Sequence, residues 1–282
     1  MRVRSSGQDA AGSLMMCRKW TWHGGSGSMI WQLMFLESGK VLGIKRFPSQ
    51  RNASLFCLDR QTGSALCDDF VLTFGNGSDV PVGEGWMTGL ETIHGELVFC
   101  HSYQPGSPEH LGLWAVDLPG RNVVWSRPEL VFAANLGDTF LAYRTSVFAG
   151  FPERDYRLVD PQTGSEIEHI GTGHERPNQL RNSAGSEESR QGIVLPELCL
   201  AGAEPVECLS YGASRVEGYH RMAGAEAGSW VSGLRVMTGD LIVYEDTMAA
   251  HSLMPLFNNF LIKGSTLYYI KENEELISVE LT

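Results

Sequence analysis

The sequence contains none of the short motifs that mark the commonest enzyme active sites. No G-x-S-x-G, H-E-x-x-H or G-x-x-x-x-G-K-[ST] pattern occurs in its 282 residues. Motifs therefore give no support to a serine esterase, a zinc protease or a phosphate-binding loop. The glycine-rich stretch at residues 24–28 is not followed by Gly-Lys and is expected to be a connector. We expect no cofactor.

The sequence also lacks an excess of positive charge. It has 22 Lys and Arg against 33 Asp and Glu, which gives a formal net charge of −11. Because nucleic acids and anionic lipids attract clustered Lys and Arg, we expect neither as a partner. No apolar run approaches the ~18 residues of a membrane span, and residues 14–17 are too short for the apolar core of a secretory signal. The sequence predicts a cytoplasmic protein, and we expect a monomer.

Cysteine is infrequent and shows no metal-binding or redox spacing. None of the six cysteines belongs to a C-x-x-C pattern. Most lie in apolar stretches, as in Phe56-Cys57-Leu58 and Phe99-Cys100. We therefore predict buried free thiols in a reducing compartment, and no metal site. The six are Cys17, Cys57, Cys67, Cys100, Cys199 and Cys208.

A short strand-and-turn pattern recurs along the chain. Residues 58–63 read Leu-Asp-Arg-Gln-Thr-Gly, and residues 159–164 read Val-Asp-Pro-Gln-Thr-Gly. Weaker copies lie at residues 113–120, 232–239 and 276–282. Aspartate hydrogen-bonds its own backbone in such turns and glycine supplies a positive φ. Each copy therefore predicts an apolar strand that runs into a tight turn.

A turn glycine precedes each copy at a similar distance. These glycines are Gly39, Gly95, Gly137, Gly212 and Gly264, and an apolar strand follows each of them. The two markers define a unit of four short antiparallel strands, A to D, repeated roughly every forty residues. The sequence therefore predicts an all-β fold, a β-propeller of four-stranded antiparallel blades. Five blades account for the copies, and six are the alternative.

The two ends of the chain are predicted to complete one blade together. The last unit has candidates for strands A to C only, at residues 256–281, whereas the stretch around Trp20 and Trp22 stands before the first unit. We expect this N-terminal strand to close the ring as the missing fourth strand. Residues 1–13 are expected to be disordered and residues 14–282 to form a single propeller domain. The polar insert at about 171–205 is expected to be a long surface loop or an extra blade.

The turns resemble those of quinoprotein-like propellers. Their repeat carries Leu-Asp, then Thr-Gly, then a Trp in the outer strand. Trp125 stands where that Trp belongs after Asp117, whereas Cys67 and Glu168 replace it elsewhere. Most of the chain, including residues 31–33 and 110–117, also resembles an uncharacterised bacterial family, a domain of unknown function. The resemblance implies a propeller fold, and it implies neither quinone binding nor an activity.

Candidate ligand-binding residues lie in the B–C and D–A loops, which form one face of a propeller. Glu109 and His110 sit in one B–C loop, and Arg154 and Asp155 in the next, so these four are expected to be adjacent. A metal site shared by three loop histidines is an alternative interpretation, and exposure of these histidines to solvent is the simpler one. The candidate site residues are Glu84, Glu109, His110, Arg154, Asp155 and His251, and the three histidines are His23, His110 and His251.

Polar residues also occur in the strands that line the predicted channel. These residues are expected to bond to channel water, which a small polar ligand could replace. His94, His101 and His220 lie in or beside strands, and we expect their rings to have hydrogen-bond partners within the blades. The channel-lining polar residues are Gln32, Thr88, Glu91, Asn135, Glu207 and Asn258.

Two functions fit these observations. The first is a non-enzymatic binding or scaffold module that takes a protein, a peptide or a small ligand on one propeller face. The alternative is a hydrolase or lyase that acts on a glycoside through loop carboxylates at the channel mouth. A pair of carboxylates about 5–9.5 Å apart in a hollow would favour the enzyme, and an apolar face would favour the binding module.

Overall fold

The computed structural model describes residues 16–75, 77–104, 106–201, 204–223 and 229–281, and strands dominate it. The expected disordered segment, residues 1–13, lies outside this part of the chain. The strands form five antiparallel sheets, which are the blades of a β-propeller, as predicted. Among the described residues, no helix has the length and apolar character needed to cross a membrane.

Blades one to three are four-stranded meanders in chain order, with the first strand innermost. Blade one contains β2 (Met29–Phe35), β3 (Val41–Phe47), β4 (Asn52–Leu58) and β5 (Ala65–Phe70). The 3-10 helix η1 (Val82–Gly85) precedes blade two, which contains β6 (Thr88–His94), β7 (Leu97–Tyr103), β8 (His110–Asp117) and β9 (Asn122–Arg127). Blade three contains β10 (Val131–Asn135), β11 (Phe140–Phe148), β12 (Phe151–Val159) and β13 (Glu166–Gly171).

Blades four and five each gain a strand from the insert. The insert forms α1 (Glu175–Ser183), α2 (Glu187–Gln191), β14 (Ile193–Val194) and β15 (Glu197–Ala201). β15 is the first strand of blade four, before β16 (Glu204–Tyr211), β17 (Ser214–Met222), β18 (Trp230–Thr238) and β19 (Leu241–Ser252). β14 borders blade five, which contains β20 (Phe260–Lys263), β21 (Thr266–Lys271), β22 (Glu275–Glu280) and β1 (Arg18–His23).

The N-terminal strand completes blade five, as the sequence predicted. β1 pairs antiparallel with β22, with Trp20 opposite Ser278 and Trp22 opposite Leu276. Exposed and buried residues alternate along β1, and the two tryptophans are its buried positions. Their rings belong to an apolar cluster that also contains Phe56 of blade one and Tyr268 of blade five. The packing of these rings therefore closes the junction between the first and last blades.

The five turn glycines lie where the sequence placed them. Each connects the A and B strands of its blade and has a positive φ between 57° and 94°. A residue with a Cβ is strained in this region, so glycine is the residue that the turn requires. The five positions are Gly39, Gly95, Gly137, Gly212 and Gly264.

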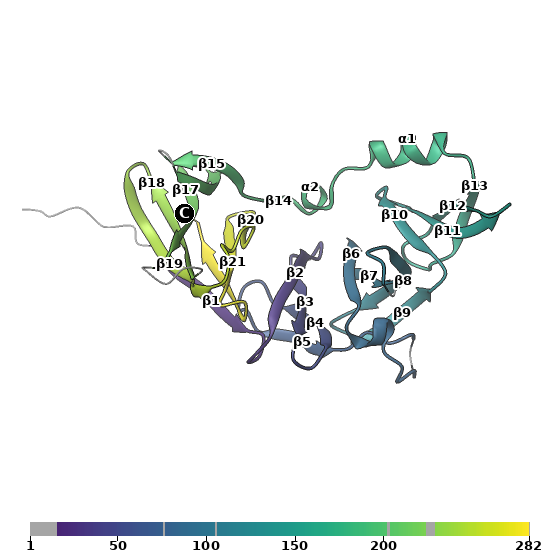
Figure 1. The fold of residues 1–282 in the computed structure, drawn as a ribbon, viewed down its shortest axis with the longest axis horizontal. Coiled ribbons are helices and arrows are strands. Elements are labelled where there is room, and N and C mark those ends of the chain that lie inside the picture. The colour runs from purple at the N-terminus through teal and green to yellow at the C-terminus, as the bar shows by residue number, and fades with distance from the viewer. Residues whose placement is uncertain (1–15, 76, 105, 202–203, 224–228, 282) are drawn as a thin grey trace, which may run out of the picture.

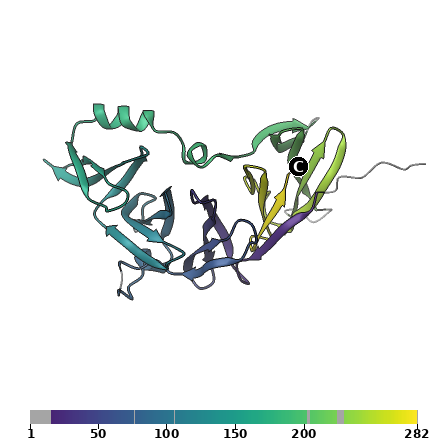
Figure 2. The same ribbon diagram turned by 180° about the vertical axis from the view of Figure 1, so that it is seen from behind.

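The blades follow one another along an arc, with blades three and four at its two ends (Figures 1 and 2). The insert spans from one end to the other, and its helix α2 lies above the inner strands. Glu187 of α2 accepts a hydrogen bond from Thr92 of blade two (2.7 Å), and Gln191 accepts one from the backbone of Phe35 of blade one (2.8 Å). The lysine Lys263 of blade five donates to the carbonyl oxygen of Gln191. The insert therefore forms neither a plain loop nor a sixth blade, because two of its side chains and one of its backbone carbonyl groups fasten α2 to three blades.

The prediction of six free thiols is wrong for one pair. Cys199 of β15 and Cys208 of β16 form a disulfide between neighbouring strands. The extra strand β15, which the sequence did not reveal, brings these two residues together. Cys57, Cys67 and Cys100 are free and buried, as expected.

Candidate functional site

A cleft of about 570 Å³ opens on the loop face between blades one and two. This volume falls within the usual range of small-ligand sites. Phe74, Met87 and Tyr103 contribute large apolar surfaces, and Arg51 and Glu84 contribute charge. The complete lining is Arg51, Phe74, Val80, Pro81, Gly83, Glu84, Met87, Ser102, Tyr103 and Gly106.

The connection between β5 and β6 forms the wall of this cleft. An isolated bridge joins Thr73 to Pro81, and η1 then turns the chain back toward blade two. Gly83 and Glu84 both have positive φ values, 57° and 55°, which few residues with a side chain adopt. The backbone N–H of Tyr103 donates to the carbonyl oxygen of Met87 (2.9 Å), which ties this wall to β7. The loop is therefore held by backbone bonds to the blade beneath it.

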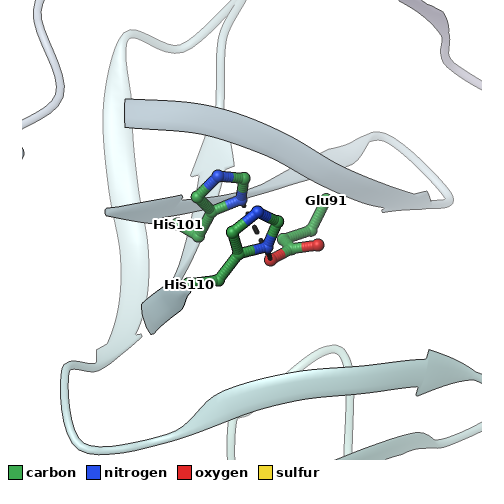
Figure 3. A group of neighbouring side chains, drawn as sticks. All are labelled: Glu91, His101 and His110. Atoms are coloured by element: carbon green, nitrogen blue, oxygen red, sulfur yellow. Dashed lines mark hydrogen bonds and ion pairs between the residues drawn. The ribbon is translucent and has the colours of Figure 1, made fainter. Parts of the chain in front are cut away.

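Beside the cleft, the imidazole rings of His101 and His110 contact the carboxylate of Glu91, all three in blade two (Figure 3). The Nδ1 atom of His110 lies 2.6 Å from Oε1 of Glu91, and Nδ1 of His101 lies 2.9 Å from the same oxygen. The two imidazole rings stack with centroids 3.5 Å apart. Tyr103, which lines the cleft, also packs its ring edge-on against both imidazoles. We call Glu91, His101 and His110 the blade-two triad.

The local strand geometry aims these side chains at one another. Glu91 is the extra residue of a β-bulge, between Leu90 and Thr92, where β6 pairs with β7. Such bulges redirect a side chain out of the regular alternation of a strand. A Cβ atom on Gly89, opposite His101, would lie only 2.6 Å from the Nε2 atom of that ring. Gly89 therefore makes the space that the His101 ring occupies.

The environment sets the charge of each group. Burial raises the pKa of Glu91, but the two imidazoles beside it outweigh burial and hold its pKa below the usual range. The hydrogen bond with Glu91 raises the pKa of His110 more than burial lowers it. Burial lowers the pKa of His101 in spite of the nearby carboxylate. Relative to the same groups in water, the structure favours the ionised form of Glu91, the protonated form of His110 and the neutral form of His101.

The six predicted site residues do not form one group. Glu84 lines the cleft and His110 belongs to the triad. Arg154 places its guanidinium 4.8 Å from the ring centre of Tyr143, and a hydrogen bond with Tyr156 raises its pKa, with a smaller contribution from the charge of Glu109. Glu109 lies in the loop before β8.

Four of the six predicted residues lie in strands instead of loops, namely His110 at the start of β8, His251 in β19, and Arg154 and Asp155 in β12. β11 and β12 form a long hairpin, so Arg154 and Asp155 are strand residues, opposite Thr145 and Arg144. Neighbouring side chains of a strand point to opposite faces. Asp155 accordingly contacts Arg157 and His169 and not the loop of His110.

The loop histidines do not meet. His251 is exposed in β19 of blade four, and His23 contacts Glu274 in blade five. Across the described ranges, one group of histidine, cysteine and carboxylate ligand atoms lies within 4.8 Å, and it is the blade-two triad. Of its members, sequence reasoning placed Glu91 on the channel lining and His101 inside a blade. Strand pairing, which is not visible in the sequence, joins them to His110.

His101 follows the expected pattern of satisfied strand histidines in part. Its Nδ1 atom lies 2.9 Å from the carboxylate of Glu91, whereas its buried Nε2 atom has no hydrogen-bond partner within the described part of the chain. His220 follows the expectation, because its ring contacts Ser232 (2.9 Å) and Glu207 (3.3 Å). Glu207 also accepts a hydrogen bond from the backbone of Asn258, so this second network fastens the loop between blades four and five.

Two polar residues of the inner strands, Gln32 and Asn135, connect neighbouring blades. The side chain of Gln32 in blade one accepts a hydrogen bond from the backbone of Leu90 in blade two (2.9 Å). Asn135 of blade three donates to Thr92 of blade two (2.7 Å). The expectation that these groups bond mainly to channel water is therefore wrong for Gln32 and Asn135, because neighbouring blades approach closely enough to supply protein partners.

Comparisons with known proteins add little to this description. No protein family profile and no curated protein matches the chain. Similar solved structures include TolB from Acinetobacter baumannii (8% identity, TM-score 0.24), with 91% of this chain and 64% of that chain covered. The chain thus spans less than two thirds of TolB. The Dos1 propeller (8% identity, TM-score 0.23, 95% and 96% covered) and Drosophila Semaphorin 1b, extracellular domains 1–2 (10%, 0.18, 90% and 74%), are further examples.

The strand order itself carries the fold assignment. Five antiparallel sheets follow one another with the first strand of each innermost in blades one to three, and the N-terminal strand completes the last blade. The chain is therefore a β-propeller protein of five blades.

Proposed function

We propose that the chain is a binding module that takes the apolar side chain of a peptide segment in the cleft between blades one and two, and that it acts as a monomer. The observation that carries the proposal is the lining of this cleft. Phe74, Met87 and Tyr103 offer aromatic and thioether surfaces, which adapt to apolar partners of different shape. Arg51 and Glu84 supply charges at which the ends or flanks of a peptide can be held.

Exposure of the wall residues supports the same proposal. Phe74 is 44% exposed and Val80 is 59% exposed, although both are large and apolar. An apolar surface gathered in a hollow and bordered by charged residues is typical of an interaction site. Other hollows have comparable volumes but present more charge: one of about 580 Å³ beside the Cys199–Cys208 disulfide contains Glu197 and Arg215, and one of about 590 Å³ beside α1 contains Glu175 and Arg176.

The carboxylates favour the binding module over the glycoside-acting enzyme. Glycoside hydrolysis requires two carboxyl groups about 5–9.5 Å apart. Among the described residues that line the cleft, Glu84 is the one carboxylate. The nearby Glu91 is held by two imidazoles and is 9% exposed, so it is not free to act on a sugar.

Selection from a displayed peptide library tests the proposal. We expect enriched peptides to share a large apolar side chain and to lose at least about tenfold in affinity for the variants Met87→Glu and Phe74→Ser, which corresponds to about 1.4 kcal/mol. The matched control is Met254→Glu, since Met254 is 67% exposed in the loop after β19. Thermal melting of each variant separates loss of binding from loss of folding.

Two results would reject the cleft as the binding site. One is enrichment of peptides that bind Met87→Glu and Phe74→Ser as tightly as the unaltered chain. The other is loss of binding in the Met254→Glu control, which would place the peptide on the opposite part of the loop face.

We also propose that the repeats are of the quinoprotein-like type. A second proposal is that the chain is cytoplasmic. Support for the repeat type comes from Trp125, whose ring covers Gly164 in the Asp-x-x-Thr-Gly turn of the next blade. Support for the location comes from the buried free thiols, whereas the Cys199–Cys208 disulfide favours an oxidising compartment. Neither proposal includes the binding of a quinone by this chain.

A further inference from the structure

We propose that the blade-two triad binds one divalent transition-metal ion, with zinc as its preferred occupant. Glu91 of β6, His101 of β7 and His110 of β8 come from three adjacent strands of one sheet. Their ligand atoms lie within 4.8 Å of one another (Figure 3). Two imidazoles and one carboxylate are a ligand set that zinc uses in proteins. The proposal goes beyond the peptide cleft and does not depend on it.

The first supporting observation is the partly unsatisfied ring of His101. Its side chain is 1% exposed, and its Nδ1 atom lies 2.9 Å from the carboxylate of Glu91. Its Nε2 atom is buried and has no hydrogen-bond partner among the described residues. A buried polar group without a partner costs free energy. An ion bound at this ring would give His101 a partner that the protein alone does not fully supply.

The second observation comes from the sister blades, which build the same bulge with other residues. The bulge position of Glu91 in β6 corresponds to Trp31 in β2 and to Ala133 in β10. In blade one, Trp31 stacks on the guanidinium of Arg46, with 4.6 Å between the guanidinium carbon and the ring centre. The fold therefore accepts an indole or a methyl group at this position. A buried carboxylate between two imidazoles is specific to blade two and is not a requirement of the propeller.

The ligand atoms are close enough for an ion, and the rings must rotate to bind it. Two ligand atoms 2.0–2.2 Å from a tetrahedral zinc ion lie about 3.3–3.6 Å apart. The present separations from Oε1 of Glu91 are 2.6 Å to His110 and 2.9 Å to His101, so these contacts must widen by about 0.4–1.0 Å. Because an ion lies in the plane of each imidazole that binds it, one of the two stacked rings must also turn out of the stack.

The chemistry of the ligands selects the kind of ion. Imidazole nitrogen is a good ligand for zinc, copper, iron and nickel, whereas calcium and magnesium require oxygen ligands. Three protein ligands leave a fourth position for water or another donor. Solvent reaches the triad at His110, which is 36% exposed, while the other two members are buried.

The test uses the untagged full chain, stripped of metal with a chelator and titrated with zinc against a chromophoric competitor. We expect one zinc ion per chain and a higher melting temperature in its presence. Glu91→Gln and His110→Ala should each weaken zinc binding at least about tenfold. Glu91→Gln preserves the size of the side chain and His110 is partly exposed, so both variants should fold. Cobalt absorption spectra of the loaded chain would report the loss of a nitrogen ligand in His110→Ala.

Controls fix the interpretation of this titration. His251→Ala removes an exposed histidine from blade four and should retain the stoichiometry of one. Calcium should neither bind at the triad nor displace zinc. Absence of stoichiometric zinc binding would overturn the proposal. It would also be overturned if Glu91→Gln and His110→Ala, shown to be folded by circular dichroism, bound zinc as tightly as the unaltered chain.

Discussion

The indole of Trp20 in blade five covers Gly63, the last residue of the Asp-x-x-Thr-Gly turn of blade one. Its N–H group donates to the carbonyl oxygen of Arg60 (2.8 Å), and a Cβ atom on Gly63 would lie 2.7 Å from the ring. Trp125 of blade two makes the same arrangement with Gly164 of blade three, and its N–H donates to Pro161 (3.0 Å). The outer strand of one blade is thus fixed to the Asp-x-x-Thr-Gly turn of the next.

Replacement of Gly63 or Gly164 by alanine should therefore destabilise the fold by about 2–4 kcal/mol. Each has a positive φ, near 70°, and the new methyl group would also collide with an indole. Gly239→Ala is the control, because Gly239 has a φ of 59° but no heavy atom within 4 Å of the place that a Cβ atom would take. It should lose only the conformational part, about 1 kcal/mol. Denaturant unfolding of the three variants checks this, and equal losses would contradict packing by the indoles.

Removal of residues 1–23 should lower the melting temperature by on the order of 10 °C or more. The deletion exposes the edge of β22 and removes the buried rings of Trp20 and Trp22, each of which is worth about 3–5 kcal/mol in a core. Trp20→Ala with Trp22→Ala should reproduce most of the effect. Thr21→Ala, at an exposed position of the same strand, should change little. An unaltered melting curve of the deletion would show that β1 does not close the junction.

Asp246 joins blade four to blade five through an ionic network. Its carboxylate lies 2.7 Å from Arg18 and 2.8 Å from Lys271, and it accepts a hydrogen bond from the hydroxyl of Tyr269 (2.5 Å). Burial raises the pKa of Asp246, but the bonds from Lys271 and Tyr269 outweigh burial, so its pKa lies below the ordinary value of 3.8. The folded state therefore favours the ionised form.

The contribution of Asp246 to stability should be complete above about pH 5 and should fall as the pH drops below the ordinary pKa, because the unfolded chain takes up the proton first. Asp246→Asn should cost about 1–3 kcal/mol at pH 7 and less at pH 3. Asp240→Asn, in the exposed turn before β19, serves as the control. Urea unfolding across this pH range measures the difference, and a cost that is equal at pH 3 and pH 7 would argue against the network.

Thiol titration should distinguish the disulfide of the structure from the sequence prediction that all six cysteines are thiols. We expect reduction to add two reactive thiols to those already found in denaturant, because Cys199 and Cys208 are bonded. In the folded chain, the reactivity of Cys57 should be low, since burial raises the pKa of its thiol to about 12 and the thiolate is the reactive form. Six reactive thiols in denaturant without reductant would exclude the disulfide.

Features set by backbone conformation could be predicted from the sequence. Gly63 and Gly164 need a positive φ, and Asp59 and Asp160 accept backbone hydrogen bonds within their own turns, so short motifs reveal them. The pairing of β1 with β22 followed from counting strands in each unit. These features depend on local chemistry or on the regular order of strands in a repeat.

The triad and the insert could not be predicted in the same way. Glu91 and His101 are brought together by the register of β6 and β7, and the bulge at Glu91 breaks the alternation on which sequence reasoning depends. The sequence of α2 predicts a polar loop, because Glu187 and Gln191 are hydrophilic. Their partners, Thr92 and the backbone of Phe35, belong to blades nearly a hundred residues or more away.

The most direct measurement of the binding cleft uses the methionine methyl groups as reporters. The chain has ten methionines, and Met87 lines the cleft, whereas Met34 is buried in the core and Met254 is exposed after β19. In a spectrum of the ¹³C-methyl-labelled chain, a selected peptide should shift the signal of Met87 and leave those of Met34 and Met254 in place. A shift of Met254 with Met87 unchanged would contradict binding between blades one and two.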